Sequence, residues 1–310
     1  MLACGPPPSR SRCNFYSGPW GLELVERTDT TAYLRASGPE HHVLELHASA
    51  QNGLHHLGFA AATPQEVDDC AAWVRAEGAQ VVEDPRRGDR PGGGYAFRFL
   101  DFENRVIEVS AEVFAVPERE RSNPVPRKVA HCVLNTVDID TAVASYTRLL
   151  GLRVSDWSEH KMVFLRSNAD HHVIAFNQHD WAGPNHVAYE VSSLDAFMRS
   201  MGRLKVSGHE TSWGPGRHGP GDNAFAYYID PAGLVPEVTA EVMQIDEETW
   251  MPRVWRRTPE LSDLFRTAGP PTPRMRKHMG GVADPGWAAV DRAEPRDAGP
   301  LLIPMPDVTY

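Results

Sequence analysis

The stretch Asp230–Val242, DPAGLVPEVTAEV, reveals the organisation of the chain, because an earlier stretch of the same chain resembles it. Asp101–Val113, DFENRVIEVSAEV, has the same leading aspartate, the same Glu-Val pair and the same closing Ala-Glu-Val. Other matched segments start 130 or 131 residues apart, at Phe15 and Ser145, Tyr33 and Phe164, and His55 and Asn185. Self-similarity at a nearly constant separation indicates a duplicated folding unit.

The duplication predicts two homologous domains, at residues 1–115 and 126–245. In each copy the second histidine of an HH pair precedes the next matched histidine by 14 residues, from His42 to His56 and from His172 to His186. After residue 245 the chain becomes rich in proline and glycine and has no hydrophobic period. We therefore expect a C-terminal tail at 246–310 that wraps the surface or is partly disordered, with room for one short helix at 262–269.

Each copy alternates short apolar strands with helical patterns. Residues 128–137 are typical of a strand, and residues 138–151 of a helix that begins after an N-cap at Asp138 and ends at Gly151. Three short strands follow, and the unit then recurs with a Gly-rich loop after its helix. The pattern predicts an α+β fold of four tandem βαβββ modules, two per domain.

The first module is expected to be truncated. The segment MLACGPPPSRSR does not resemble its counterpart HCVLNTVDIDTA, and three consecutive prolines disfavour a helix. Its first strand and most of its first helix are therefore predicted to be missing or replaced.

Composition and charge exclude several classes of partner. The chain has 310 residues and a formal charge of −10, so it has no basic surplus for a nucleic acid. No apolar run approaches the roughly 18 residues that a membrane span needs, and the first residues lack the apolar core of a signal peptide. The 4 cysteines show no CxxC spacing and are typical of a reducing compartment. These features predict a cytoplasmic protein.

Two histidines and one glutamate of the second domain suggest a metal site. His131 and His186 stand at strand starts and Glu237 in the last strand. Taken alone, a strand histidine is more often a packed core residue, and a strand glutamate more often faces solvent. Their equivalent places in repeated units favour ligands, because two imidazoles and a carboxylate leave three positions open on a divalent ion such as Fe(II) or Mn(II).

The second domain resembles the type I extradiol catechol dioxygenases of the vicinal oxygen chelate superfamily, which includes glyoxalases and bleomycin-resistance proteins. The matching motifs are VAHCVLNTVD, HHVIAF fourteen residues before NHVAYEV, and GPGRHGPGDNAFAYYIDPAG. The resemblance implies a curved, mostly antiparallel sheet around a pocket in each domain. It implies cleavage of a catechol by O2 at Fe(II) or Mn(II) in aromatic degradation.

The resemblance also assigns residues. It makes His131, His186 and Glu237 the metal ligands and His172 the acid–base catalyst, although His171 adjoins it. His218 and Tyr227 would contact substrate and oxygen. A histidine imidazole suits proton transfer near neutral pH, and a tyrosine hydroxyl can stabilise charge on a bound oxygen.

Further predictions concern Pro236, His179 and the first domain. Pro236 directly precedes Glu237, which predicts an edge strand or a bulge because proline has no N–H for the ladder. His179 is expected to be exposed. In the first domain His56 and Glu108 match two ligands, but the third position is Met1, so this domain is predicted to be a scaffold without metal.

Substrate preference rests on two tryptophans. Relatives that accept acidic catechols have an arginine five residues before the GRH histidine, and this chain has Trp213 there. Trp181 precedes His186 closely, so both favour an uncharged substituent in the pocket. The basic residues Arg274, Arg276 and Lys277 of the tail could restore a positive charge.

Two other functions remain open on these residues. One is a different superfamily enzyme such as a glyoxalase-like isomerase, which would use a second carboxylate in place of His172, His218 and Tyr227. The other is a binding protein without catalysis. We expect self-association to a homo-oligomer, since open curved sheets leave edges and faces to cover.

Overall fold

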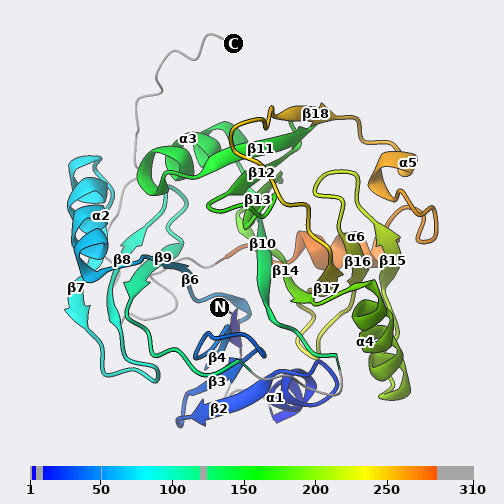
Figure 1. Cartoon of the computed structure of the whole chain (residues 1–310), viewed down its shortest axis with the longest axis horizontal. Coiled ribbons are helices and arrows are strands. Elements are labelled where there is room, and N and C mark those ends of the chain that lie inside the picture. Colours follow the sequence, from blue (N-terminus) through cyan, green and yellow to red (C-terminus); the bar gives the residue numbers. More distant parts are fainter. Residues whose placement is uncertain (1, 5–9, 50, 119–123, 285–310) are drawn as a thin grey trace.

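The computed structural model describes residues 2–4, 10–49, 51–118 and 124–284 of the chain. Helices α1–α4 lie around the outside of the molecule and the sheets lie inside (Figure 1). Among the described residues, no helix is long and apolar enough to cross a membrane.

The N-terminal half forms two sheets, with strand orders β2-β3-β4-β1-β5 and β6-β9-β8-β7. Its elements are β1 Leu2–Cys4, α1 Arg10–Ser17, β2 Glu23–Arg27, β3 Thr31–Arg35, β4 Leu44–Ala48, β5 Gly53–Leu54, β6 Leu57–Ala60, α2 Pro64–Ala76, β7 Val81–Arg87, β8 Tyr95–Leu100 and β9 Val106–Ala111.

The C-terminal half forms one nine-stranded sheet, with strand order β15-β16-β17-β14-β10-β13-β12-β11-β18. Its elements are β10 Lys128–Thr136, α3 Ile139–Leu150, β11 Arg153–Ser158, β12 Met162–Arg166, β13 Ile174–Gln178, β14 Gly183–Val191, α4 Leu194–Val206, β15 Trp213–Arg217, β16 Ala224–Tyr227, β17 Pro236–Ala240, β18 Arg253–Trp255, α5 Pro259–Ser262 and α6 Pro273–Gly280.

The two halves share one pairing scheme. Strand β10 pairs in parallel with β13 and antiparallel with β14, as β1 does with β4 and β5. The parallel pair β14–β17 likewise corresponds to β6–β9. The predicted α+β fold of repeated βαβββ modules is confirmed.

The first module is shortened, but less than its sequence predicts. Strand β1 has 3 residues where β10 has 9, yet it pairs on both sides. Helix α1 has 8 residues where α3 has 12. The first strand and most of the first helix, predicted to be missing or replaced, are present in shortened form, because the prolines at 6–8 precede the helix and proline breaks a helix only from inside it.

Local signals set the helices of the second domain. The Asp138 side chain accepts the N–H of Thr141 at the start of α3, and Gly151 ends that helix with φ 66°. Helix α4 begins in the same way, with the Ser193 side chain accepting the N–H of Ala196.

Two predictions about the last module are wrong. Residues 213–217 of the expected Gly-rich loop form strand β15, which pairs with β16. Strand β17 lies between β16 and β14, so Pro236 is on neither an edge nor a bulge. Pro236 is tolerated as the first residue of the strand, where its carbonyl accepts the N–H of Tyr228 at 2.9 Å and no N–H is required of it.

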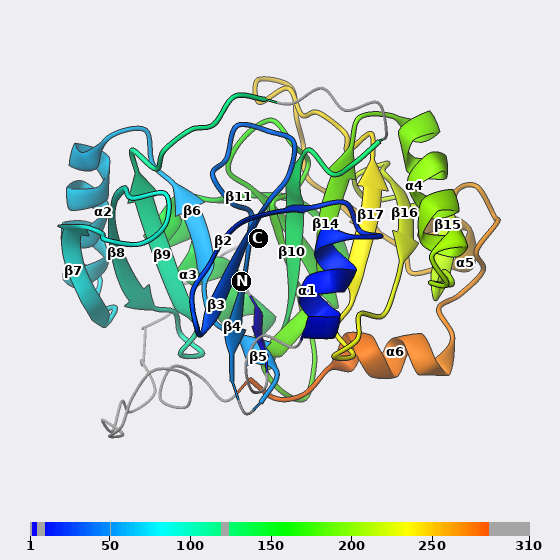
Figure 2. The same ribbon diagram turned by 90° about the horizontal axis from the view of Figure 1, so that it is seen from below.

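The C-terminal segment packs on the second domain up to residue 284, and 285–310 lie outside the described residues. Strand β18 extends the sheet beside β11 (Figure 1). Helix α6 lies at one end of strands β16 and β17 (Figure 2). Its residue Met275 is buried in a cluster with Phe225 and Tyr227. The expected helix at 262–269 is absent there, because α5 ends at Ser262. The Asp263 carboxylate instead accepts the N–H groups of Phe265 and Ala268, which competes with helical hydrogen bonding.

The two cores each join elements of both halves. One core packs α2 and its sheet with α3, and the other packs α1 and strands β3 and β4 with α4. Buried hydrogen bonds reinforce both contacts: Tyr146 on α3 donates to Asp101, and Tyr16 on α1 donates to Asp230. Since Asp101 and Asp230 open the two repeated turns, each domain supplies a helix that holds the turn of the other.

Candidate active site

Three neighbouring strands bring the proposed ligands onto one face of the large sheet. His131 on β10 lies opposite Ala188 on β14, and Ala188 lies opposite Glu237 on β17. Residues opposite each other in a sheet point to the same face, as do residues two apart along one strand. His186, two residues before Ala188, therefore joins this face, and the small Ala188 side chain leaves space among the three.

A register shift between Val129 and His131 contributes to this placement. An irregularity of this kind re-aims a side chain and is common beside active sites. The result is that His131, His186 and Glu237 converge, with the ligand atoms all within 4.8 Å of one another.

The distances fit a metal ion. The Nε2 atoms of His131 and His186 each lie 3.3 Å from Oε2 of Glu237. Two ligand atoms bound at about 2.1 Å and at 90–110° to each other lie about 3.0–3.4 Å apart. All three side chains are buried, and Oε2 of Glu237 has no hydrogen-bond partner in the described structure. An unpaired carboxylate oxygen between two imidazoles is the arrangement that a divalent cation satisfies.

The surroundings of the three proposed ligands favour an ionised Glu237 and a neutral His186, the forms that bind a metal ion. Burial raises the pKa of Glu237, but the adjacent imidazoles of His131 and His186 outweigh burial and hold this pKa well below its usual range. Burial lowers the pKa of His186 despite the nearby carboxylate. The Nδ1–H of His186 donates to Oδ1 of Asn185 at 2.7 Å, which leaves the lone pair on Nε2, directed at Glu237.

The proposed acid–base residue lies beside the ligands. The His172 ring centroid is 4.2 Å from that of His131, and the side chain is buried. Burial, followed by the neighbouring imidazoles His131 and His171, lowers the pKa of His172 well below its ordinary value. His172 is therefore neutral near pH 7 and can accept a proton.

Tyr227 and His218 form a hydrogen-bonded pair on the other side of the ligands. Tyr227 lies opposite Glu237 in the β16–β17 ladder, with its ring centroid 5.1 Å from that of His186. The Nδ1–H of His218 donates to the Ser262 carbonyl at 3.1 Å, so its Nε2 accepts the Tyr227 hydroxyl at 2.9 Å. Burial raises the pKa of Tyr227 well above its ordinary value and lowers that of His218 to about 4, so both are neutral near pH 7.

The two tryptophans attach the C-terminal segment to the domain. The indole N–H of Trp213 donates to the Gly269 carbonyl and that of Trp181 to the Gly280 carbonyl. The Trp213 ring also stacks on Tyr227, with centroids 5.0 Å apart. Their contact with substrate stays a prediction.

The basic residues of the tail, Arg274, Arg276 and Lys277, are exposed on α6. The prediction that His179 is exposed is wrong: it is half-buried, with its ring 4.2 Å from that of Trp181.

Two supporting residues are not predicted from the sequence. Asn185 orients His186, and Asn223 directs its amide at Oε1 of Glu237 from 3.5 Å while donating to Thr239. The adjacency of Asn185 to a suspected ligand is a signal that could have found it, whereas Asn223 resembles an ordinary loop residue.

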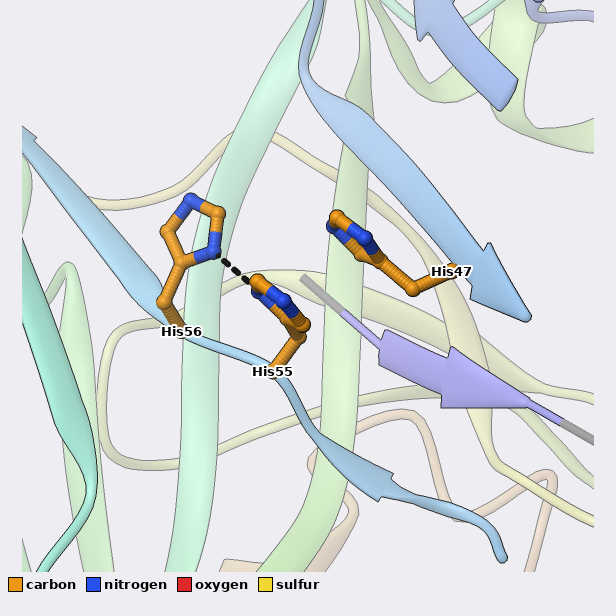
Figure 3. A group of neighbouring side chains, drawn as sticks. All are labelled: His47, His55 and His56. Atoms are coloured by element: carbon orange, nitrogen blue, oxygen red, sulfur yellow. Dashed lines mark hydrogen bonds between the residues drawn. The ribbon is translucent and has the colours of Figure 1, made fainter. Parts of the chain in front are cut away.

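The first domain places other histidines together. His47, His55 and His56 lie close to one another around β5 (Figure 3). The rings of His47 and His55 are stacked, with centroids 3.5 Å apart and an angle of 3° between their planes. An imidazole lone pair lies in the plane of its ring, so two parallel stacked rings cannot bind one ion unless a ring turns.

In the first domain, the glutamate that corresponds to the proposed ligand Glu237 is paired with arginines. Glu108, which matches Glu237, pairs with Arg98 at 2.8 Å and with Arg90. The position matching His131 is residue 1, outside the described residues. A first domain without metal stays a prediction.

Comparisons with known proteins place the chain in a family. The profile of the Glyoxalase/Bleomycin resistance protein/Dioxygenase superfamily matches residues 10–109 and 128–238. Metapyrocatechase 2 of Cupriavidus necator is 30% identical over 191 residues, which covers 54% of this chain and only 58% of that protein. The manganese-dependent 2,3-dihydroxybiphenyl 1,2-dioxygenase of Geobacillus genomosp. 3 is 26% identical over 81% of this chain and 86% of its own length.

Solved structures of other proteins have the same fold as this chain. The Mn(II)-bound glyoxalase from Novosphingobium aromaticivorans has a TM-score of 0.87 and 35% identity, and the match covers 94% of this chain and 96% of that one. Homoprotocatechuate 2,3-dioxygenase from Brevibacterium fuscum has the same fold, with a TM-score of 0.78 and 21% identity over 89% of each chain. The superfamily inferred from the repeated motifs is thus confirmed: the chain belongs to the Glyoxalase/Bleomycin resistance protein/Dioxygenase superfamily.

Proposed function

We propose that this protein is a metal-dependent extradiol dioxygenase that cleaves the ring of a catechol-type diol with O2. The observation that carries the proposal is the face shared by His131, His186 and Glu237, with His172 on one side and the Tyr227–His218 pair on the other. Relatives named metapyrocatechase and 2,3-dihydroxybiphenyl dioxygenase support this assignment.

The metal proposed for His131, His186 and Glu237 is Fe(II), with Mn(II) as the alternative. Two imidazoles and one carboxylate accept either ion, and manganese is named for two of the relatives. When bound, the ion would supply Lewis acidity that lowers the pKa of a coordinated hydroxyl.

His172 is assigned the proton transfers. Ring cleavage puts both atoms of O2 into the product and leaves its hydrogen count equal to that of the diol. A proton taken from a diol hydroxyl must therefore return to the reacting atoms within one turnover. His172 is buried, neutral and beside the ligands, so it can take the proton and can give it back readily.

Tyr227 and His218 are assigned the stabilisation of charge on oxygen. Because His218 donates to the fixed Ser262 carbonyl, its Nε2 holds the Tyr227 hydroxyl in one orientation. A hydroxyl held in place in a dry site stabilises developing negative charge without reorganising.

A neutral catechol is the proposed substrate class. Trp213 stacks on Tyr227 where acid-accepting relatives have arginine, and the basic residues of α6 are exposed. A carboxylated substituent would lose its hydration there without an ionic partner.

The proposal is tested by loading the metal-free protein anaerobically with Fe(II) or Mn(II) and adding catechol or 2,3-dihydroxybiphenyl under air. We expect one bound ion per chain and a yellow ring-cleaved product. Glu237→Gln is the matched control, because it keeps the shape of the side chain but removes the charge that holds the ion. Metal binding without O2 uptake would refute the dioxygenase assignment.

A glyoxalase-type isomerase is the second candidate, because the Novosphingobium protein of similar structure is named a glyoxalase. Its assay is the conversion of the methylglyoxal–glutathione hemithioacetal, followed by formation of the thioester. We expect no conversion, because the described site offers imidazoles and a tyrosine where such an isomerase needs a second carboxylate. Turnover of the hemithioacetal with no consumption of O2 would favour this candidate.

A further inference from the structure

A buried chain of hydrogen bonds links His172 to His171 and Asp156. Nδ1 of His172 lies 3.0 Å from Nδ1 of His171, and Nε2 of His171 lies 3.0 Å from Oδ2 of Asp156. All three side chains are buried. No part of the proposed function requires His171 or Asp156.

The C-terminal segment fixes the Asp156 carboxylate. The backbone N–H of Arg253 donates to Oδ1 at 2.7 Å, and the indole N–H of Trp255 donates to Oδ2 at 2.7 Å. Both groups belong to β18, which pairs with β11 directly beside Asp156. Since a backbone N–H and an indole N–H can only donate, each oxygen of Asp156 is already an acceptor.

These bonds determine where the protons lie. Asp156 accepts at both oxygens, so its contact with His171 is a donation from Nε2–H of the imidazole. A neutral His171 with its proton on Nε2 has a lone pair on Nδ1. For this form of His171, the 3.0 Å contact is a bond donated by Nδ1–H of His172, and the lone pair of His172 lies on Nε2.

We infer that Asp156 and His171 are positioning residues that set the tautomer of His172, so that its Nε2 is the nitrogen that accepts the substrate proton. The inference rests on the proposed function for the role of His172, whereas the tautomer itself is independent of any activity. A carboxylate that orients an imidazole through Nδ1–H is a known way to make Nε2 the base. Here a second imidazole stands between the carboxylate and the base.

The repeat offers an internal comparison. His41 and His42 of the first domain make the same Nδ1–Nδ1 contact at 3.0 Å. The position matching Asp156 is Glu26, which is exposed on β2, and no element corresponding to β18 covers it among the described residues. Among the described residues, a buried carboxylate at this matched position occurs only in the second copy, which also holds the cluster of His131, His186 and Glu237.

The test combines two readouts on the full chain. Histidine labelled with ¹⁵N reports which ring nitrogen of His172 carries the proton in the metal-free protein, and the signal is assigned by comparison with His172→Ala. Steady-state kinetics of the Fe(II)-loaded protein report kcat and KM for catechol. We expect Nδ1–H on His172 in the unmodified protein.

Asp156→Asn should weaken the preference for this tautomer, because the amide has one acceptor oxygen where Asp156 offers two to the N–H groups of Arg253, Trp255 and His171. We expect kcat to fall by about 10²–10⁴-fold with KM nearly unchanged. His171→Gln, which leaves the bonds between Asp156 and β18 intact, should lower kcat similarly.

Two controls separate positioning from stability. Trp255→Phe removes one bond to Asp156 but keeps the carboxylate, so it should keep the tautomer and most of kcat. Glu26→Gln changes the matched position of the first domain and should change neither readout. A proton on Nε2 of His172 in the unmodified protein, or normal kcat in both Asp156→Asn and His171→Gln, would overturn the inference. Absence of ring cleavage in the unmodified protein would refute the proposed function but leave the NMR result decisive for the tautomer.

Discussion

At the scale of single residues, the candidate site depends on which atoms face each other. Glu237 presents an unpaired oxygen to two imidazole nitrogens at 3.3 Å, and Asn185 selects the nitrogen that His186 offers. His172 contacts the ligand His131 but is bonded on its other side to His171. The proposed proton transfer therefore uses His172, whereas the proposed metal binding uses other side chains. A substitution of His172 can test the first role without removing a proposed ligand.

His172→Ala should retain the metal and lose most turnover. The ligand atoms of His131, His186 and Glu237 are untouched, whereas the proposed proton carrier is removed. We expect kcat for catechol to fall by about 10²–10⁴-fold at unchanged metal content. Metal analysis and O2 uptake measure the two quantities. Near-normal turnover would transfer the role to His171 or His218.

Trp213→Arg should shift substrate preference toward acidic catechols. An arginine there can pair with a substrate carboxylate, and a hydrogen bond to a charged group is worth about 1.5–3 kcal/mol, or roughly 10–100-fold in relative kcat/KM. The measurement compares 3-methylcatechol with a carboxymethyl catechol. Trp213→Gln is the control for lost stacking on Tyr227 without added charge. A strong preference of the unmodified protein for the acidic catechol would contradict the pocket assignment and direct attention to Arg274 and Arg276.

At the scale of elements, two helices connect the halves of the molecule in the same way. Tyr146 on α3 donates to Asp101 at 2.9 Å, and Arg105 pairs with the same carboxylate at 2.9 Å. Tyr16 on α1 makes the corresponding contact with Asp230, and Arg12 of the same helix pairs with that carboxylate. Tyr16 and Tyr146 occupy matched positions of the repeat, so the contact is duplicated along with the modules.

Tyr146→Phe should destabilise the protein without changing the site. The substitution removes one buried hydrogen bond to Asp101, and Arg105 still pairs with that carboxylate. We expect the free energy of unfolding in urea to fall by about 1–2 kcal/mol, with metal content unchanged. Tyr228→Phe, which removes a partly buried bond to Thr211, is the comparison and should cost less. Equal stability of Tyr146→Phe and the unmodified protein would show that the bond contributes nothing.

At the scale of the whole molecule, one buried carboxylate makes the stability of the first domain depend on pH. Burial raises the pKa of Glu45, but hydrogen bonds from His42 and His47 at 3.0 and 2.7 Å outweigh it, and this pKa lies well below its usual range. A depressed carboxyl pKa stabilises the fold above the unfolded value of about 4.3, and that stabilisation is lost as pH falls below it.

Glu45→Gln should therefore lose stability at pH 6 and a smaller amount at pH 3, because the stabilisation begins to fall below the unfolded pKa and is fully lost only below the folded pKa. Urea unfolding of both proteins at several pH values measures the difference, which should shrink as pH falls below about 5. Glu26→Gln is the control, since Glu26 is exposed, and its difference from the unmodified protein should not depend on pH. A difference for Glu45→Gln that is constant from pH 6 to pH 3 would contradict this role of Glu45.

The modules, most of their helices and strands, and the superfamily can be inferred from the sequence alone. Matched segments 129 to 131 residues apart revealed the duplication, and local signals such as Asp138 and Gly151 marked the ends of a helix. These features are readable because hydrophobic period and helix capping involve residues only a few positions apart. The same logic failed at residues 262–269, where the Asp263 side chain holds the backbone in turns.

The contacts that hold the residues of the candidate site in place are visible only in the folded protein. Asp156 meets Arg253 and Trp255, which lie 97 and 99 residues further along the chain. His218 meets the Ser262 carbonyl of a segment whose composition predicts only a tail. Contacts over such separations leave no period or spacing in the sequence, because they depend on which strands become neighbours. Repeat and spacing therefore indicated the residues of the candidate metal centre, and the fold determines which of their nitrogens face one another.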